Sequence, residues 1–172
     1  DSDDATIAHV LNRIGYGPKP GQIETVRQIG LARYIDRQLH PERISDAGMI
    51  ARLGGLPTLS LSSREIAERY ERPLLQERAQ RRREAGKAAA GGPAADPRSR
   101  NAEAQQASLP LVELSEQTIL RSVYSERQLE EVLTDFWFNH FNVDARKGPV
   151  RFMLTSYERD TIRPHVLGHF RD

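Results

Sequence analysis

The chain has 172 residues, of which 28% are charged and 38% are hydrophobic, and its formal net charge is +1. No apolar run is long enough to cross a bilayer, so the sequence excludes a transmembrane helix. The absence of cysteine excludes disulfides, thiol catalysis and cysteine-ligated zinc within this chain. Arginine supplies most of the positive charge, because lysine occurs only at Lys19, Lys87 and Lys147.

Residues 1–75 show apolar side chains at helical spacing in several short segments, separated by glycine and proline. Helices are predicted at 7–14, 23–29, 31–39, 49–53 and 62–70. Ser62 and Glu65 have the spacing of a capping box, which marks the start of the last of these helices. We expect residues 1–75 to form the N-terminal helical part of one domain.

Residues 76–108 contain no apolar side chain larger than alanine. This segment, rich in Arg, Ala and Gly, can bury little apolar surface, so burial would not offset the conformational entropy lost on ordering. We therefore predict that it is a flexible insert. Its first part, 76–90, is also compatible with a solvated helix. Acidic residues interrupt the arginines and no aromatic residue lies nearby, so nucleic-acid binding is not expected. We expect proteases to cut first between Arg78 and Arg100.

The core helical part is expected at 109–172, packed on the first part, with a helix at 111–123 followed by the strongest periodic pattern. Apolar residues recur at Leu129, Val132, Leu133, Phe136, Trp137 and Phe141, and leave Glu130, Glu131 and Asp135 on the opposite side. Ser125 and Gln128 have capping-box spacing before this run. The pattern predicts a central helix whose Trp137 and His140 face the core.

The C-terminal stretch predicts helices at 150–157 and 164–172, with a break before Pro164. On a helix, His165, His169 and Asp172 would align on one face, an arrangement that can bind zinc or iron. The zinc-protease pattern requires Glu directly after the first His, where this chain has Val166, so a solvated polar face is the alternative. No stop signal follows Phe170, and we expect the chain to continue beyond Asp172.

His140, beside Asn139, is the main candidate for chemistry. A buried imidazole needs a polar partner, so His140 is either a general base, metal ligand or haem ligand, or a structural histidine bonded to a neighbour.

Further binding candidates lie in three places. His9 stands in the first helix, which the Gly15–Gly17 turn follows. The backbone amides of this turn are candidates to bind an anion or a sugar. The alternative is that the turn only joins two helices. Arg146 and Lys147 are candidates for a phosphate or carboxylate, with a pairing to Asp144 as the alternative. Arg163 belongs to a group of charged residues that predicts an ion-pair network, together with Glu158, Arg159 and Asp160. The alternative is that Glu158 and Asp160 act as an acid/base pair.

Three sequence blocks resemble a bacterial family catalogued as "domain of unknown function 1800" (DUF1800). The blocks are HVLNRIGYG at 9–17, FWFNHFNV at 136–143 with Lys147 and Gly148 after it, and TSYERDTIRPHVLG at 155–168. The resemblance implies a mostly helical protein, usually much longer than this chain, often exported, and commonly encoded beside a protein that resembles alkaline-phosphatase-like hydrolases. It implies no activity.

Together these features predict an all-α fold, an irregular multi-helix bundle with a long flexible insert, forming the N-terminal part of a larger helical domain. The leading hypothesis is a helical accessory or scaffold module of an exported bacterial protein, periplasmic or secreted, with a hydrolase-like protein encoded nearby and the rest of its own chain as partners. The alternative is part of a metal- or haem-assisted enzyme with His140 in its site. The residues leave cofactor content and catalysis open.

Overall fold

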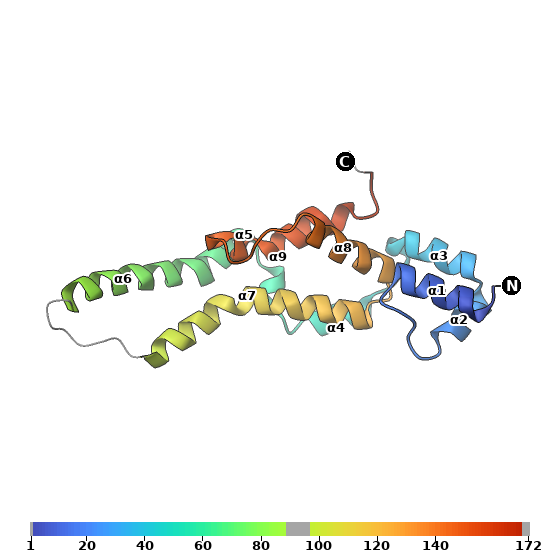
Figure 1. Ribbon diagram of the computed structural model, residues 1–172, viewed down its shortest axis with the longest axis horizontal. Coiled ribbons are helices and arrows are strands. Elements are labelled where there is room, and N and C mark those ends of the chain that lie inside the picture. The colour runs from blue at the N-terminus through green and yellow to red at the C-terminus, as the bar shows by residue number, and fades with distance from the viewer. Residues whose placement is uncertain (1, 89–96, 170–172) are drawn as a thin grey trace. The chain divides into compact units, whose positions relative to one another are not determined.

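The computed structural model describes residues 2–88 and 97–169, and their regular structure is entirely helical (Figure 1). This confirms the predicted all-α class. The α-helices are α1 (Asp4–Ile14), α2 (Gln22–Ile29), α3 (Leu31–Leu39), α4 (Ala47–Leu53), α5 (Ser63–Ile66), α6 (Arg72–Ala88), α7 (Pro97–Tyr124), α8 (Gln128–His140) and α9 (Leu154–Ser156). In the part of the chain that the structure describes, no helix is long and apolar enough to cross a membrane.

The described residues form two compact units, each assembled from segments far apart in sequence. Unit 1 contains residues 2–55, 116–142 and 158–169, and unit 2 contains 56–88, 97–115 and 143–157. The predicted insert, 76–108, has helical backbone at 76–88 in α6 and at 97–108 in α7. Residues 89–96 lie outside the described residues, and the flexibility of the insert stays a prediction.

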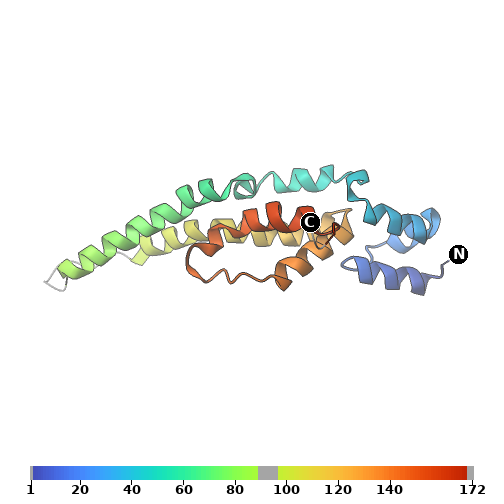
Figure 2. The ribbon, with the colours of Figure 1, turned by 90° about the horizontal axis from the view of Figure 1, so that it is seen from above.

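Unit 1 has a small apolar core formed by its first three helices. Figures 1 and 2 show these three helices side by side. Ile7 and Leu11 lie one helical turn apart on α1 and pack with Val26 of α2 and Tyr34 of α3. Helix α1 begins where the Asp3 side chain accepts a hydrogen bond from the Thr6 amide at 2.7 Å. Gly30 joins α2 to α3 with φ of 87°, a left-handed value that favours glycine.

Helix α8 forms where the sequence predicts it, but the prediction of its buried face was wrong. The buried side chains are polar: Gln128, Glu131 and Thr134. Phe136 is 54% exposed and Phe141 is 46% exposed, while His140 is exposed and Trp137 is half-buried. The reason is that the polar face meets charged and polar groups from other segments of unit 1, which periodicity along one helix does not reveal.

The start of α8 is also held differently from the prediction. Ser125 and Gln128 do not form a capping box; instead Gln38 of α3 accepts a hydrogen bond from the Leu129 amide at 3.1 Å. Gln38 also donates to the Glu126 carbonyl at 2.9 Å. Asp46 accepts hydrogen bonds from the Ser125 hydroxyl at 2.9 Å and from the Glu126 amide at 3.0 Å. Tertiary contacts therefore cap this helix.

Unit 2 is built around a second apolar cluster of Leu61, Ile66 and Phe152, against which Tyr70 and Leu74 pack. The predicted capping box of Ser62 and Glu65 is confirmed at the start of α5. From α5 the chain continues through a π-helical turn at Ala67–Glu71 into α6 without a break in the ribbon (Figure 2). The buried Glu113 carboxylate accepts hydrogen bonds from the Thr58 amide at 2.7 Å and hydroxyl at 2.6 Å.

The C-terminal segments are less regular than predicted. The expected helix at 150–157 is a 3₁₀ turn (Gly148–Phe152) followed by α9, and a π-helical segment covers Tyr157–Ile162. The expected helix at 164–172 is wrong for its described residues, which form a 3₁₀ turn (Arg163–His165) and further turns up to 169. The Gly168 amide closes this stretch by donating to the His165 carbonyl at 3.0 Å. Residues 170–172 lie outside the described residues.

Candidate functional site

The polar face of α8 lies in a buried ion network within unit 1. Glu131 is 3% exposed, and Arg163 donates to both of its carboxylate oxygens at 2.9 Å. Arg163 also donates to Glu158 at 2.8 Å. Arg121 of α7 donates to Glu131 at 3.0 Å, and Gln117 donates to Glu158 at 3.0 Å. Buried charges are costly unless they are paired, and here each of the two carboxylates has an arginine partner.

A small cavity of about 20 Å³ adjoins this network, with room for about one water molecule. Tyr16 lies at its wall and donates from its hydroxyl to the Glu131 carbonyl at 3.4 Å. Burial, together with the nearby carboxylates of Asp135 and Glu131, raises the pKa of Tyr16 to about 12. Burial would lower the pKa of Arg163, but the charges of Glu131 and Glu158 outweigh it and raise that pKa, so Arg163 stays charged.

The opposite side of α8 carries four rings in mutual contact, which we call the ring cluster: Phe136, Trp137, His140 and Phe141. The Trp137 and Phe141 rings stack with centroids 5.4 Å apart, and the His140 ring stacks on Phe136 at 5.8 Å. Trp137 also makes T-shaped contacts with Phe136 at 5.0 Å and with His140 at 5.4 Å between ring centroids. Aromatic rings arranged in this way with their outer faces in water are typical of binding surfaces.

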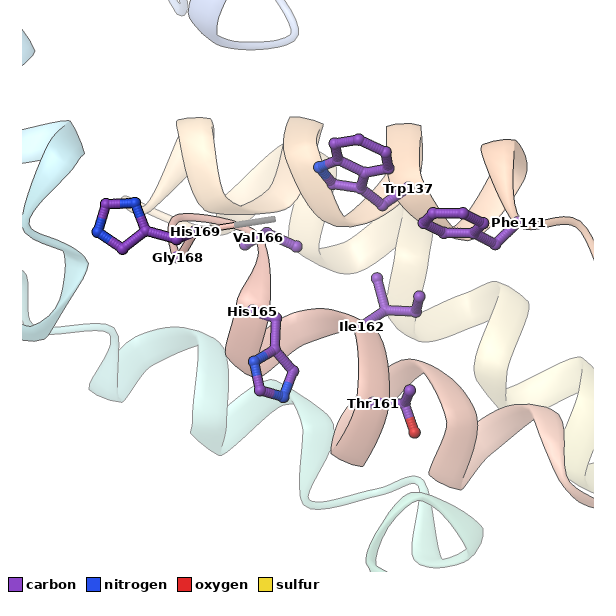
Figure 3. A pocket seen from close by; sticks show the side chains of 8 residues that line it. All are labelled: Trp137, Phe141, Thr161, Ile162, His165, Val166, Gly168 and His169. Carbon is purple, nitrogen blue, oxygen red and sulfur yellow. The ribbon is translucent and has the colours of Figure 1, made fainter. Parts of the chain in front are cut away.

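A pocket of about 390 Å³ opens between the ring cluster and residues 161–169, which include the end of the π-helical segment Tyr157–Ile162 and the turns that follow it (Figure 3). It is lined by Trp137, Phe141, Thr161, Ile162, His165, Val166, Gly168 and His169. Figure 3 shows Ile162 pointing toward the two aromatic rings, while the imidazoles of His165 and His169 lie at separate edges and point away from one another. The pocket is therefore apolar in the middle and polar at its edges.

The predicted catalytic pair does not form a polar site. The expectation that His140 faces the core was wrong, because its exposed ring packs on the other rings of the cluster. Asn139 is exposed and donates to the Asp135 carbonyl at 2.8 Å and carboxylate at 3.0 Å, within its own helix. His140 is not among the residues that line the pocket.

The predicted binding residues are dispersed. His9 is exposed on α1 of unit 1, whereas Arg146 and Lys147 are exposed in unit 2, where Arg146 pairs with Asp144 at 3.0 Å. Arg163 alone of these enters the ion network. The predicted ion pairs around it are confirmed, since Arg163 pairs with Glu158 and Arg159 pairs with Asp160 at 2.7 Å.

Two of the three residues predicted to bind a metal lie in the described part of the chain. His165 and His169 share a pocket wall but do not stand on a helix, and Asp172 lies outside the described residues. Among the residues that the structure describes, no group of three or more acidic, histidine or cysteine side chains is placed to hold a metal ion.

Sequence reasoning missed Glu131 and Tyr16 as members of the network and Thr161 and Ile162 as pocket residues. The apolar repeat places Glu131 on the side of the helix opposite the predicted core face. One signal was available: Glu131 and Thr134 are three residues apart on α8 and share a polar face, which a cluster of arginines elsewhere in the chain can cover.

The family model described as "Protein of unknown function (DUF1800)" matches residues 9–172. The chain therefore belongs to this family, which confirms the resemblance seen in its sequence blocks. Neither the curated proteins nor the solved structures give a significant match to the chain.

Proposed function

We propose that this chain is a helical accessory or scaffold module of an exported bacterial protein, and that it acts by binding a partner through the ring cluster of α8. One observation supports this most strongly: α8 buries its polar side and leaves Phe136, His140 and Phe141 of its aromatic side exposed. Burying apolar surface stabilises a complex by about 25 cal/mol per Å², so a partner that covers the exposed rings would bind more tightly.

The contacts of the titratable groups favour binding over catalysis by His140. The imidazole of His140 touches rings, and Glu131, Glu158 and Arg163 are bonded to one another inside the unit. A general base needs a substrate proton within hydrogen-bond reach, and paired buried carboxylates are poorly placed for this. The alternative, part of a metal- or haem-assisted enzyme with His140 in the site, needs groups that converge on His140.

Co-expression of the protein with the hydrolase-like protein that we expect to be encoded beside it, followed by size-exclusion chromatography, tests the proposal. We expect a complex in the periplasmic or secreted fraction, weakened about tenfold or more by Phe136→Ala. Tyr124→Ala is the matched control, because this ring on α7 of the same unit is 47% exposed and lies outside the ring cluster.

Failure of the two proteins to co-elute would overturn the proposal. Elemental analysis and a visible absorption spectrum of the same preparation test the alternative. Bound metal or haem, together with a turnover that His140→Ala abolishes, would favour the enzyme.

A further inference from the structure

The pocket beside the ring cluster has the size of a small-molecule site. Its volume of about 390 Å³ falls within the range of about 300 to 1,000 Å³ that such sites occupy. Trp137 and Phe141 form one wall, and Ile162 faces them from the opposite segment (Figure 3). All three belong to unit 1, so the pocket does not depend on unit 2.

The aromatic wall favours a flat ligand. The planes of Trp137 and Phe141 are only 14° from parallel, so both rings offer the same orientation to a third ring. Aromatic pairs favour offset-stacked or edge-to-face contacts with centroids about 4.5 to 7 Å apart, which the open side of this wall permits. A saturated chain would gain area burial here but not this geometric preference.

The polar edges favour a ligand that accepts hydrogen bonds. Thr161, His165 and His169 supply a hydroxyl and two imidazoles, and the described residues that line this pocket include no carboxylate, lysine or arginine. A cationic ligand would meet no counter-charge among these residues, whereas an uncharged oxygen acceptor can accept a hydrogen bond from an imidazole N–H or from the hydroxyl. Because the imidazoles point apart in Figure 3, they suit separate ends of one ligand better than a shared metal ion.

We propose that this pocket binds a small planar aromatic compound that carries hydrogen-bond acceptor groups at its ends. The inference rests on the proposed function in one respect, since it takes this face of α8 to bind and not to catalyse. It adds the chemical class of a ligand, which partner binding by the ring cluster does not specify.

Titration of the protein with 8-anilinonaphthalene-1-sulfonate, an aromatic anion, tests the ligand class. Trp137 is the only tryptophan in the chain and stands in the pocket wall, so quenching of its fluorescence reports binding of the probe, and the variants locate the binding site. We expect saturable binding at one site, weakened about tenfold or more by Phe141→Ala. Tyr124→Ala is the control: this ring is 47% exposed in the same unit but belongs neither to the ring cluster nor to the residues that line the pocket, and the dissociation constant should stay within about twofold.

Val166→Phe provides a second variant, because a larger side chain at this lining position should fill the pocket and weaken binding while the ring cluster remains. Equal losses in the Tyr124 and Phe141 variants, or binding that does not saturate, would overturn the proposal. N-Methylacridinium, an aromatic cation, should bind at least about tenfold more weakly, and equal affinity would contradict the acceptor class.

The outcomes separate this inference from the proposed function. If the probe does not bind but the complex with the hydrolase-like protein forms, only the pocket proposal fails. If the probe binds and Phe141→Ala weakens it, but no complex forms, only the partner proposal fails.

Discussion

Arg163 donates hydrogen bonds from one guanidinium nitrogen to both carboxylate oxygens of Glu131, at 2.9 Å each. This pair joins α8 to the segment that forms the far wall of the pocket, since Arg163 directly follows Ile162. The bond therefore accounts for two features at once: the polar side of α8 faces inward, and the aromatic side meets the pocket.

Arg163→Met should destabilise the protein by about 3 to 5 kcal/mol, because it leaves Glu131 and Glu158 buried with fewer partners. Urea denaturation measures the free energy of unfolding. Arg159→Met is the control, since Arg159 pairs with Asp160, whose side chain is 55% exposed, and should cost about 1 kcal/mol or less. Similar losses in the two variants would mean that the network does not hold α8.

Gln38→Ala should cost about 1 to 3 kcal/mol, because it leaves the Leu129 amide and the Glu126 carbonyl without this partner at the start of α8. Gln28→Ala removes an exposed glutamine that bonds to Glu24 on the same helix, and it should change stability by less than about 0.5 kcal/mol. Circular dichroism during thermal unfolding compares the two variants. An unchanged midpoint for Gln38→Ala would contradict the tertiary cap.

Leu11→Ala should destabilise unit 1 by about 2 to 5 kcal/mol, because Leu11 is fully buried in the cluster of α1, α2 and α3. Phe136→Ala removes a larger side chain but should cost less than about 1 kcal/mol, because more than half of Phe136 is already in water. The reverse order in denaturant unfolding would place the aromatic side of α8 in the core.

These comparisons show where the sequence is informative. Helix positions follow from local signals, such as the capping box of Ser62 and Glu65 and the apolar repeat of Ile7 and Leu11, because the interactions involved are only three or four residues apart. The family resemblance likewise rests on contiguous blocks. The helical class could therefore be predicted from the sequence.

The inward face of α8 could not be predicted, because it depends on pairs such as Glu131 with Arg163 that lie 32 residues apart. An apolar stripe normally faces the core, and here partners from other segments reverse that preference. The same applies to the pocket: His165 and His169 were singled out as metal ligands on a helix, but the chain turns after Pro164 and places them along an apolar wall.

The raised pKa of Tyr16 predicts a pH effect at the alkaline end. An unfolded chain releases the tyrosine proton near pH 10, whereas folded Tyr16 holds it until about pH 12. The stabilising contribution of Tyr16 is therefore fully present below about pH 10 and is lost as the pH rises toward 12.

Tyr16→Phe should remove this part of the loss of stability between those two pH values. NMR titration of labelled tyrosine rings gives the pKa directly. A value near 10 for Tyr16 would contradict its burial beside Asp135 and Glu131.

Acrylamide quenching of Trp137 fluorescence tests the orientation of α8 most directly. The signal comes from one side chain of the ring cluster, on the side of α8 that the apolar repeat predicts to be in the core. We predict that acrylamide quenches the native protein, and that ligand binding in the pocket shields the indole. Resistance of the native protein to quenching, lost only on unfolding, would show that the indole is in the core and would contradict the account.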